Sequence, residues 1–96
     1  MPLPTVGRIV HYLLSEEDVA RIRDQLSHNP PDVSDQFNEP RLGQPYAAMV
    51  TSVNDHPTHS DVNLSVWLDG PANFFAPSRQ EGDQPGTWCW PPRKGA

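Results

Sequence analysis

The chain alternates short apolar stretches with polar segments that are rich in proline and glycine. The clearest alternation covers residues 62–68, where apolar and polar side chains follow each other with a period of two. This period predicts a strand with two different faces. The apolar face carries Val62, Leu64, Val66 and Leu68, and the other face carries Asn63, Ser65 and Trp67.

Four further segments, rich in β-branched or aromatic residues, also predict strands: 6–14, 46–54, 73–76 and 87–90. The polar residues 55–61 lie between two of the strands and predict the turn of a hairpin. We therefore expect a mainly β fold, a small antiparallel barrel or a bent sheet of about five short strands.

One short helix interrupts this pattern. Ser15 is a suitable N-cap, acidic residues fill the first turn, and Val19, Ile22 and Leu26 follow at helical spacing, which predicts a helix over 16–28. Residues 29–45 contain four prolines and predict a long irregular loop whose role the sequence leaves open. We expect a single domain over 1–96, with the helix and loop inserted at 15–45 and a flexible tail at 93–96.

Composition narrows the class of protein. A length of 96 residues suits one small core, and a net charge of −5 disfavours binding of duplex nucleic acid. The longest apolar run, 46–50, is too short to cross a membrane, and residues 1–5 lack the features of a secretory signal, so we expect a cytosolic protein. Because so small a core contributes little stability, we expect a homo-oligomer, a dimer or tetramer.

Residues suited to catalysis are sparse. His56 and His59 have ligand-like spacing, but no third ligand stands elsewhere at a recognisable spacing, and polar residues are common at hairpin tips. Cys89 lies on a predicted strand between two tryptophans, which favours a packed thiol over a nucleophile. We therefore expect no enzyme activity, no cofactor and no metal.

The aromatic residues are more informative, because three tryptophans exceed what so small a core needs. They either fill the core or a subunit interface, or one or two of them stack on a planar ligand. An aromatic ring beside an arginine suits a nucleobase and its phosphate.

Three blocks of the chain resemble a widespread family of small bacteriophage proteins. The blocks are 6–12 (VGRIVHY), 62–70 (VNLSVWLDG) and 85–92 (PGTWCWPP), in this order, and the family pattern is GRIVHY, NLxVFxDG and GTWHWP. Two positions depart from it: Cys89 stands where the family has His, and Trp67 where it has Phe. The first departure leaves open whether Cys89 replaces a histidine that contacts a ligand.

This family is similar to the small phage sponge proteins that counter cyclic-oligonucleotide (anti-CBASS) defence. The resemblance implies an immune-evasion protein in the cytoplasm of the infected bacterial host, which sequesters a nucleotide signal without cleaving it. Residue type and motif position then suggest the ligand contacts. Aromatic plates are Tyr12, Trp88 and Trp90, phosphate contacts are Arg8 and Arg79, and polar contacts are His11, Asn63 and Thr87. Trp67 is a further candidate for ligand binding. We expect this site between subunits.

Two other functions remain open at this point. A virion accessory protein or a host-protein-binding module would bury Trp67, Trp88 and Trp90 against a protein partner and bind no nucleotide. A nuclease or phosphodiesterase would need a metal, for which the sequence offers only His56 and His59 with neighbouring acids. The sequence does not name the nucleotide, its ring size or its linkage.

Overall fold

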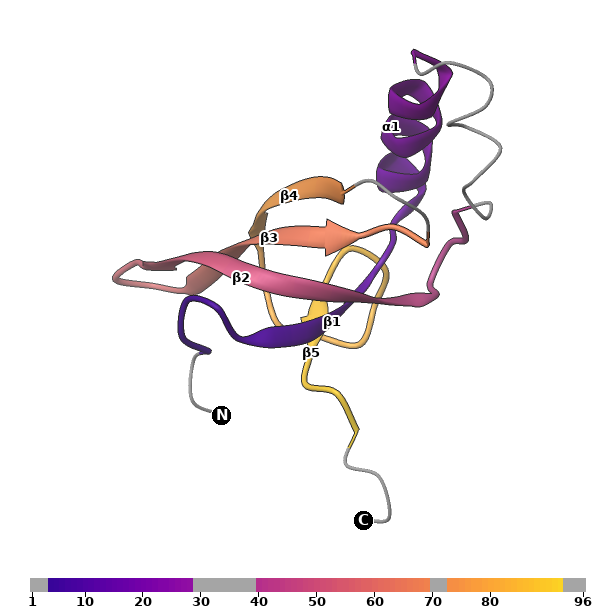
Figure 1. The fold of residues 1–96 in the computed structure, drawn as a ribbon. Coiled ribbons are helices and arrows are strands. Elements are labelled where there is room, and N and C mark those ends of the chain that lie inside the picture. Colours follow the sequence, from indigo (N-terminus) through magenta and orange to yellow (C-terminus); the bar gives the residue numbers. More distant parts are fainter. Residues whose placement is uncertain (1–3, 29–39, 70–72, 93–96) are drawn as a thin grey trace.

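Five antiparallel strands form one sheet in the computed structural model, which describes residues 4–28, 40–69 and 73–92 (Figure 1). The strand order across the sheet is β4-β3-β2-β1-β5. The elements are β1 (Ile9–Leu13), α1 (Glu16–Ser27), β2 (Pro45–Asp55), β3 (Ser60–Trp67), β4 (Asn73–Arg79) and β5 (Trp88–Cys89). The prediction of a mainly β fold with one short inserted helix is confirmed.

The sheet is open, so the bent-sheet form of the prediction holds and the barrel form is wrong. β4 and β5 are its two edges, and β5 is only two residues long and pairs with β1 alone among the strands. One isolated parallel bridge joins Glu81, just after β4, to Trp88. A single bridge does not provide the ladder of hydrogen bonds that would close the sheet into a barrel.

One face of the sheet holds the core. Along β3 and at Leu68, which directly follows it, the predicted alternation is confirmed: the four apolar side chains are buried, and Asn63, Ser65 and Trp67 are less buried. We call the face opposite the core the outer face. The buried apolar residues are Val10, Tyr12, Leu14, Ile22, Tyr46, Ala48, Val50, Val62, Leu64, Val66, Leu68, Phe74, Ala76 and Trp88.

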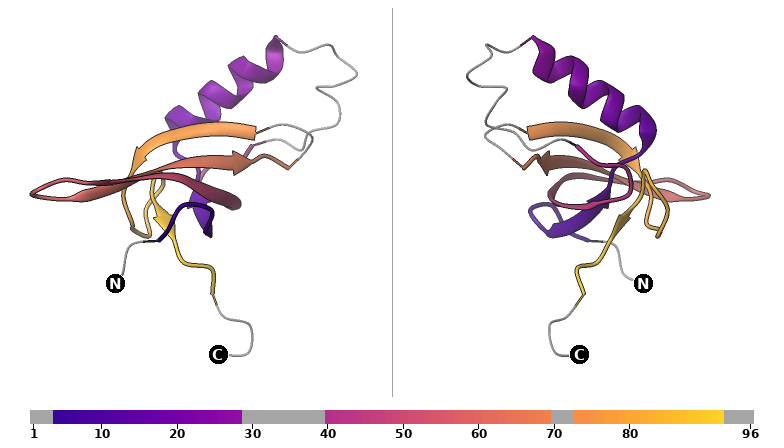
Figure 2. Two further views of the ribbon diagram at one scale, coloured as in Figure 1. Left: turned by 60° about the vertical axis from the view of Figure 1, so that its left-hand side comes forward. Right: turned by 90° about the vertical axis from the view of Figure 1, so that its right-hand side faces the viewer.

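The helix α1 begins as the sequence predicts. Ser15 Oγ accepts the Asp18 backbone N–H at 3.1 Å, and Asp18 Oδ2 accepts the Ser15 backbone N–H at 3.0 Å, which completes a capping box. The helix lies beside the edge strand β4 (Figure 2), and Gln25 Nε2 donates to the Asn73 carbonyl at 3.1 Å. Among the described residues, no helix has the length and apolar character needed to cross a membrane.

Several element boundaries differ from the prediction. β1 starts at Ile9 instead of residue 6, because Gly7 takes a positive φ of 90° in a turn. The turn of the β2–β3 hairpin is confined to residues 56–59, since pairing continues to Asp55 and Ser60. β4 extends to Arg79. Most of the predicted loop (29–39) and the tail (93–96) lie outside the described residues.

Candidate functional site

The predicted ligand residues lie on both faces of the sheet and do not converge on one site. His11, Asn63 and Trp67 lie on the outer face by strand alternation and register. Tyr12 and Trp88 face the core, and Trp90 packs against the core from the end of β5. The contacts of each residue therefore decide which ones are free to bind a ligand.

Tyr12 and Trp88 are core residues. They are directly opposed in the β1–β5 pair, and their exposed fractions are 0% and 1%. Neither ring offers a face on which a planar ligand could stack, which corrects their assignment as stacking plates. For Trp88 the alternative interpretation, a tryptophan that fills the core, describes the structure.

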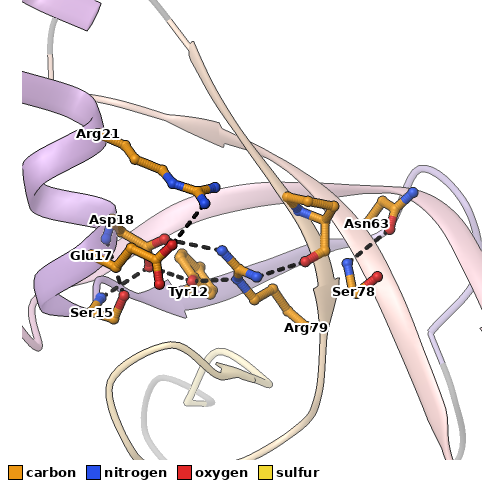
Figure 3. Close-up of polar contacts among 9 residues, drawn as sticks. Tyr12, Ser15, Glu17, Asp18, Arg21, Asn63, Ser78 and Arg79 are labelled. Atoms are coloured by element: carbon orange, nitrogen blue, oxygen red, sulfur yellow. Dashed lines mark hydrogen bonds and ion pairs between the residues drawn. The ribbon is translucent and has the colours of Figure 1, made fainter. Parts of the chain in front are cut away.

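Arg79 is bound within the protein, where it reaches Tyr12 and the first turn of α1 (Figure 3). Its Nε donates to the Tyr12 hydroxyl at 2.7 Å, its Nη1 to the Pro77 carbonyl at 2.7 Å, and its Nη2 to Asp18 Oδ1 at 3.1 Å. The Tyr12 hydroxyl in turn donates to Asp18 Oδ2. Because all three guanidinium nitrogens have protein acceptors, Arg79 has a structural role, and its contact with a ligand phosphate stays a prediction that would rely on its remaining N–H groups.

This buried network shifts the pKa values of its members. Burial, followed by the hydrogen bond to Asp18, raises the pKa of Tyr12 well above its usual range. Burial alone would raise the pKa of Asp18, but the hydrogen bonds from Ser15 and Tyr12 and the charge of Arg79 outweigh it and lower that pKa. The network therefore holds a neutral phenol, a carboxylate and a guanidinium at neutral pH.

Asn63 and Thr87 form internal hydrogen bonds, Asn63 to an irregular residue of β4 and Thr87 within the turn that precedes β5. Asn63 Oδ1 accepts the Ser78 backbone N–H at 2.9 Å, at a residue whose φ is 56° (Figure 3). Thr87 Oγ1 donates to the Gln84 carbonyl at 2.6 Å. A ligand would have to compete with these internal bonds.

His11 and Cys89 are opposed across the β1–β5 pair and are both half-buried. Burial, with smaller contributions from the charges of Glu81 and Asp83, raises the pKa of the Cys89 thiol. A thiol that resists ionisation is a poor nucleophile, in line with the expected packed role.

Arg8 and Trp90, two of the predicted ligand residues, lie in contact and remain candidates for binding a ligand. The Arg8 guanidinium carbon lies 5.2 Å from the centroid of the Trp90 ring, and Trp90 packs edge-on against Trp88. Within the described residues, Arg8 forms no ion pair, and no acceptor reaches the buried indole Nε1 of Trp90. An exposed cation and an unpaired buried N–H, side by side, form a candidate anion-binding site.

A second cluster stands at the turn of the β2–β3 hairpin. His56, His59 and Asp61 offer ligand atoms that all lie within 4.8 Å of one another. A pocket of about 400 Å³ lies beside it, lined by His59, Ser60, Asp61, Val62, Gln80, Glu81 and Trp88. The sequence carries this cluster as His-x-x-His-x-Asp, whereas the expectation of no metal rested on the lack of a third ligand elsewhere along the chain.

The outer face also exposes large apolar side chains. Ile9 is 40% exposed, Trp67 39% and Phe75 58%. Register places Ile9 opposite Met49, and Phe75 opposite Ser65, the neighbour of Trp67 on that face. These residues form an apolar area that no described segment covers.

Comparisons with family models, with curated proteins and with solved structures give no match for this chain. The resemblance to a bacteriophage family therefore remains a prediction from the three sequence blocks.

Proposed function

We propose that the protein binds a nucleotide second messenger of bacterial anti-phage defence, a cyclic oligonucleotide or a related nucleotide, and sequesters it without cleaving it. It would act in the cytoplasm of an infected bacterial host. The observation that best supports this proposal is the Arg8–Trp90 pair, since it combines a cation, an aromatic ring and a free N–H.

The chemistry of this pair suits a phosphate attached to a base. A guanidinium forms charge-assisted hydrogen bonds with phosphate oxygens, and the indole N–H of Trp90 can donate one more. A buried donor without an acceptor costs about 1–3 kcal/mol. A ligand oxygen could accept from Trp90 Nε1 once the atoms that cover this buried N–H move aside, and the new hydrogen bond would then recover that free energy.

We further propose that the protein acts as a homo-oligomer, a dimer or tetramer. The exposed apolar residues of the outer face support an interface there. His11 and Trp67 lie on that face, so an interface would bring these two predicted ligand residues close to a second subunit.

The proposal is tested by mass spectrometry of small molecules that heat releases from the protein. The protein is first incubated with a panel of cyclic di- and trinucleotides and ADP-ribose derivatives. We expect one intact nucleotide in near-stoichiometric amount. In the variants Arg8→Ala and Trp90→Phe, the affinity for that nucleotide should fall roughly tenfold or more. Arg41→Ala, which removes another exposed arginine, should leave the affinity unchanged.

Two results would overturn the proposal. Recovery of no nucleotide across the panel would reject sequestration of these ligands. Recovery of a cleaved product would make the protein an enzyme.

One observation favours a second function, a virion accessory or host-protein-binding module without a nucleotide ligand. Trp67 and Phe75 are exposed on the outer face, and aromatic residues are enriched where proteins bind one another. A stable complex with a capsid, tail or host protein, formed without any bound nucleotide and lost in Trp67→Ser, would select this function.

A further inference from the structure

We propose that His56, His59 and Asp61 bind a divalent transition-metal ion, with Zn²⁺ the best match to these donors. The site stands at the turn of the β2–β3 hairpin, outside the Arg8–Trp90 pair and independent of nucleotide binding. It also revises the expectation, drawn from the sequence, that the protein holds no metal.

The three side chains converge on one point. His56 Nε2 lies 3.2 Å from Asp61 Oδ2, and His59 Nε2 lies 3.7 Å from the same oxygen. The two imidazole rings stack, with centroids 4.5 Å apart and an angle of 23° between their planes. Donors that each lie about 2.0–2.2 Å from a tetrahedral Zn²⁺ stand roughly 3.3 Å from one another, close to the two separations found here.

The surrounding hydrogen bonds hold the ligands in this orientation. Asn54 Nδ2 donates to Asp61 Oδ1 at 2.8 Å and leaves Oδ2 facing the two histidines. Thr58 Oγ1 lies 3.1 Å from His59 Nδ1, so that nitrogen is occupied and Nε2 is the one free to bind. Bonds of this kind to the far side of a ligand are typical of metal sites.

Two hydrogen bonds stabilise the turn that carries the histidines. The His56 backbone N–H donates to the His59 carbonyl at 2.8 Å, and Ser60 Oγ donates to Asp55 Oδ1 at 2.8 Å. Both histidines are therefore presented by a closed four-residue turn at the end of a long hairpin. A rigid turn limits the entropy lost when a metal fixes the two rings.

A cation would also bridge groups of the cluster that are not joined by a hydrogen bond. One carboxylate oxygen faces two imidazole nitrogens, and at 3.7 Å the His59 nitrogen is too far away for a hydrogen bond. A single metal ion placed among the three atoms would satisfy all of them.

The chemical nature of the three ligand atoms indicates which metal ion would bind. Two imidazoles and one carboxylate suit Zn²⁺ and its transition-metal neighbours, whereas Mg²⁺ and Ca²⁺ prefer a full set of oxygen ligands. Three protein ligands leave at least one coordination position for water or an anion. His59 and Asp61 also line the pocket of about 400 Å³, which has room for such an additional ligand.

The test uses the full chain without a histidine tag. Titration calorimetry with Zn²⁺ should give one equivalent bound, and Co²⁺ should give visible absorption bands typical of low coordination number. His59→Gln and Asp61→Asn should each lower Zn²⁺ affinity roughly tenfold or more. His28→Gln is the matched control, because His28 is an exposed histidine that lies outside this turn. This variant should bind the metal as the unchanged protein does.

Thr58→Val separates positioning from ligation. It keeps all three ligands but removes the oxygen beside His59 Nδ1, so Zn²⁺ affinity should fall by about tenfold while the stoichiometry stays at one. Circular dichroism of each variant checks that the fold is kept, and His59→Gln is the safer variant because His59 is exposed. The proposal is overturned if the unchanged protein binds neither ion, or if folded His59→Gln binds Zn²⁺ with unchanged affinity.

Discussion

Arg79 Nη2 lies 3.1 Å from Asp18 Oδ1, which joins the last residue of β4 to the first turn of α1. The Tyr12 hydroxyl, from β1, bonds to both partners. Because Asp18 also completes the capping box with Ser15, one carboxylate links the start of the helix to two strands of the sheet.

Removal of the Asp18 charge should strongly destabilise the fold. Asp18→Asn leaves the guanidinium of Arg79 largely buried without its counter-ion, and we expect the free energy of unfolding to fall by about 3 kcal/mol. Urea denaturation followed by circular dichroism measures this change. Glu17→Gln removes an exposed partner of Arg21 and should cost less than about 0.5 kcal/mol. Equal effects of the two variants would show that the buried network contributes no special stability.

Stability should fall at both ends of the pH range. The folded-state pKa of Asp18 is lowered, so its contribution is complete above about pH 4 and is lost as pH falls through the folded-state value. The folded-state pKa of Tyr12 is raised, so its contribution is complete below about pH 10 and is lost as pH rises above that. Denaturation midpoints across pH should show both losses.

Tyr12→Phe provides the control for the alkaline part of this profile. The variant has no titrating phenol at this position, so the loss of stability above about pH 10 should be smaller than in the unchanged protein. An identical alkaline loss in both proteins would assign that loss to other groups.

Trp88 should be the most costly of the tryptophans to truncate. Trp88→Ala empties the largest fully buried side-chain position, and we expect a loss of about 3–5 kcal/mol in the free energy of unfolding. Leu42→Ala, at an exposed apolar residue, should change that free energy by less than about 1 kcal/mol. A small effect of Trp88→Ala in urea denaturation would contradict the core position assigned to this ring.

The outer face should control self-association. Sedimentation velocity of the unchanged protein should show a dimer or tetramer, and the double variant Trp67→Ser with Phe75→Ser should sediment as a monomer, because it removes the two large aromatic side chains of that face. Leu42→Ser, at an exposed apolar residue outside the strands, should leave the oligomer intact. A monomeric unchanged protein, or an unaltered oligomer in the double variant, would reject an interface at this face.

Local features of the sequence predicted much of the fold. The period-two pattern of 62–68 identified β3 and both of its faces, and Ser15 with Asp18 identified the start of α1. Such features are readable because neighbouring side chains in a strand alternate and a cap bonds within one turn. Residue type and motif position suggested Arg8 and Trp90 separately as ligand residues, and no sequence pattern indicated that they lie in contact.

The candidate site depended on tertiary structure. Tyr12 and Trp88 looked available as aromatic plates, yet the pairing of β1 with β5 places both rings in the core. Arg79 lies 61 residues from its partner Asp18, and no local pattern connects them.

The sequence by itself determined where the strands and the helix form, which side chains share a strand face, and that His56, His59 and Asp61 stand close along the chain. Only the tertiary structure decided which of those side chains are buried and which cationic side chains form ion pairs. It also decided that the hairpin turn directs both imidazoles toward one carboxylate. The physical reason is that periodicity depends on backbone geometry within one segment, whereas burial and side-chain convergence depend on how distant segments pack.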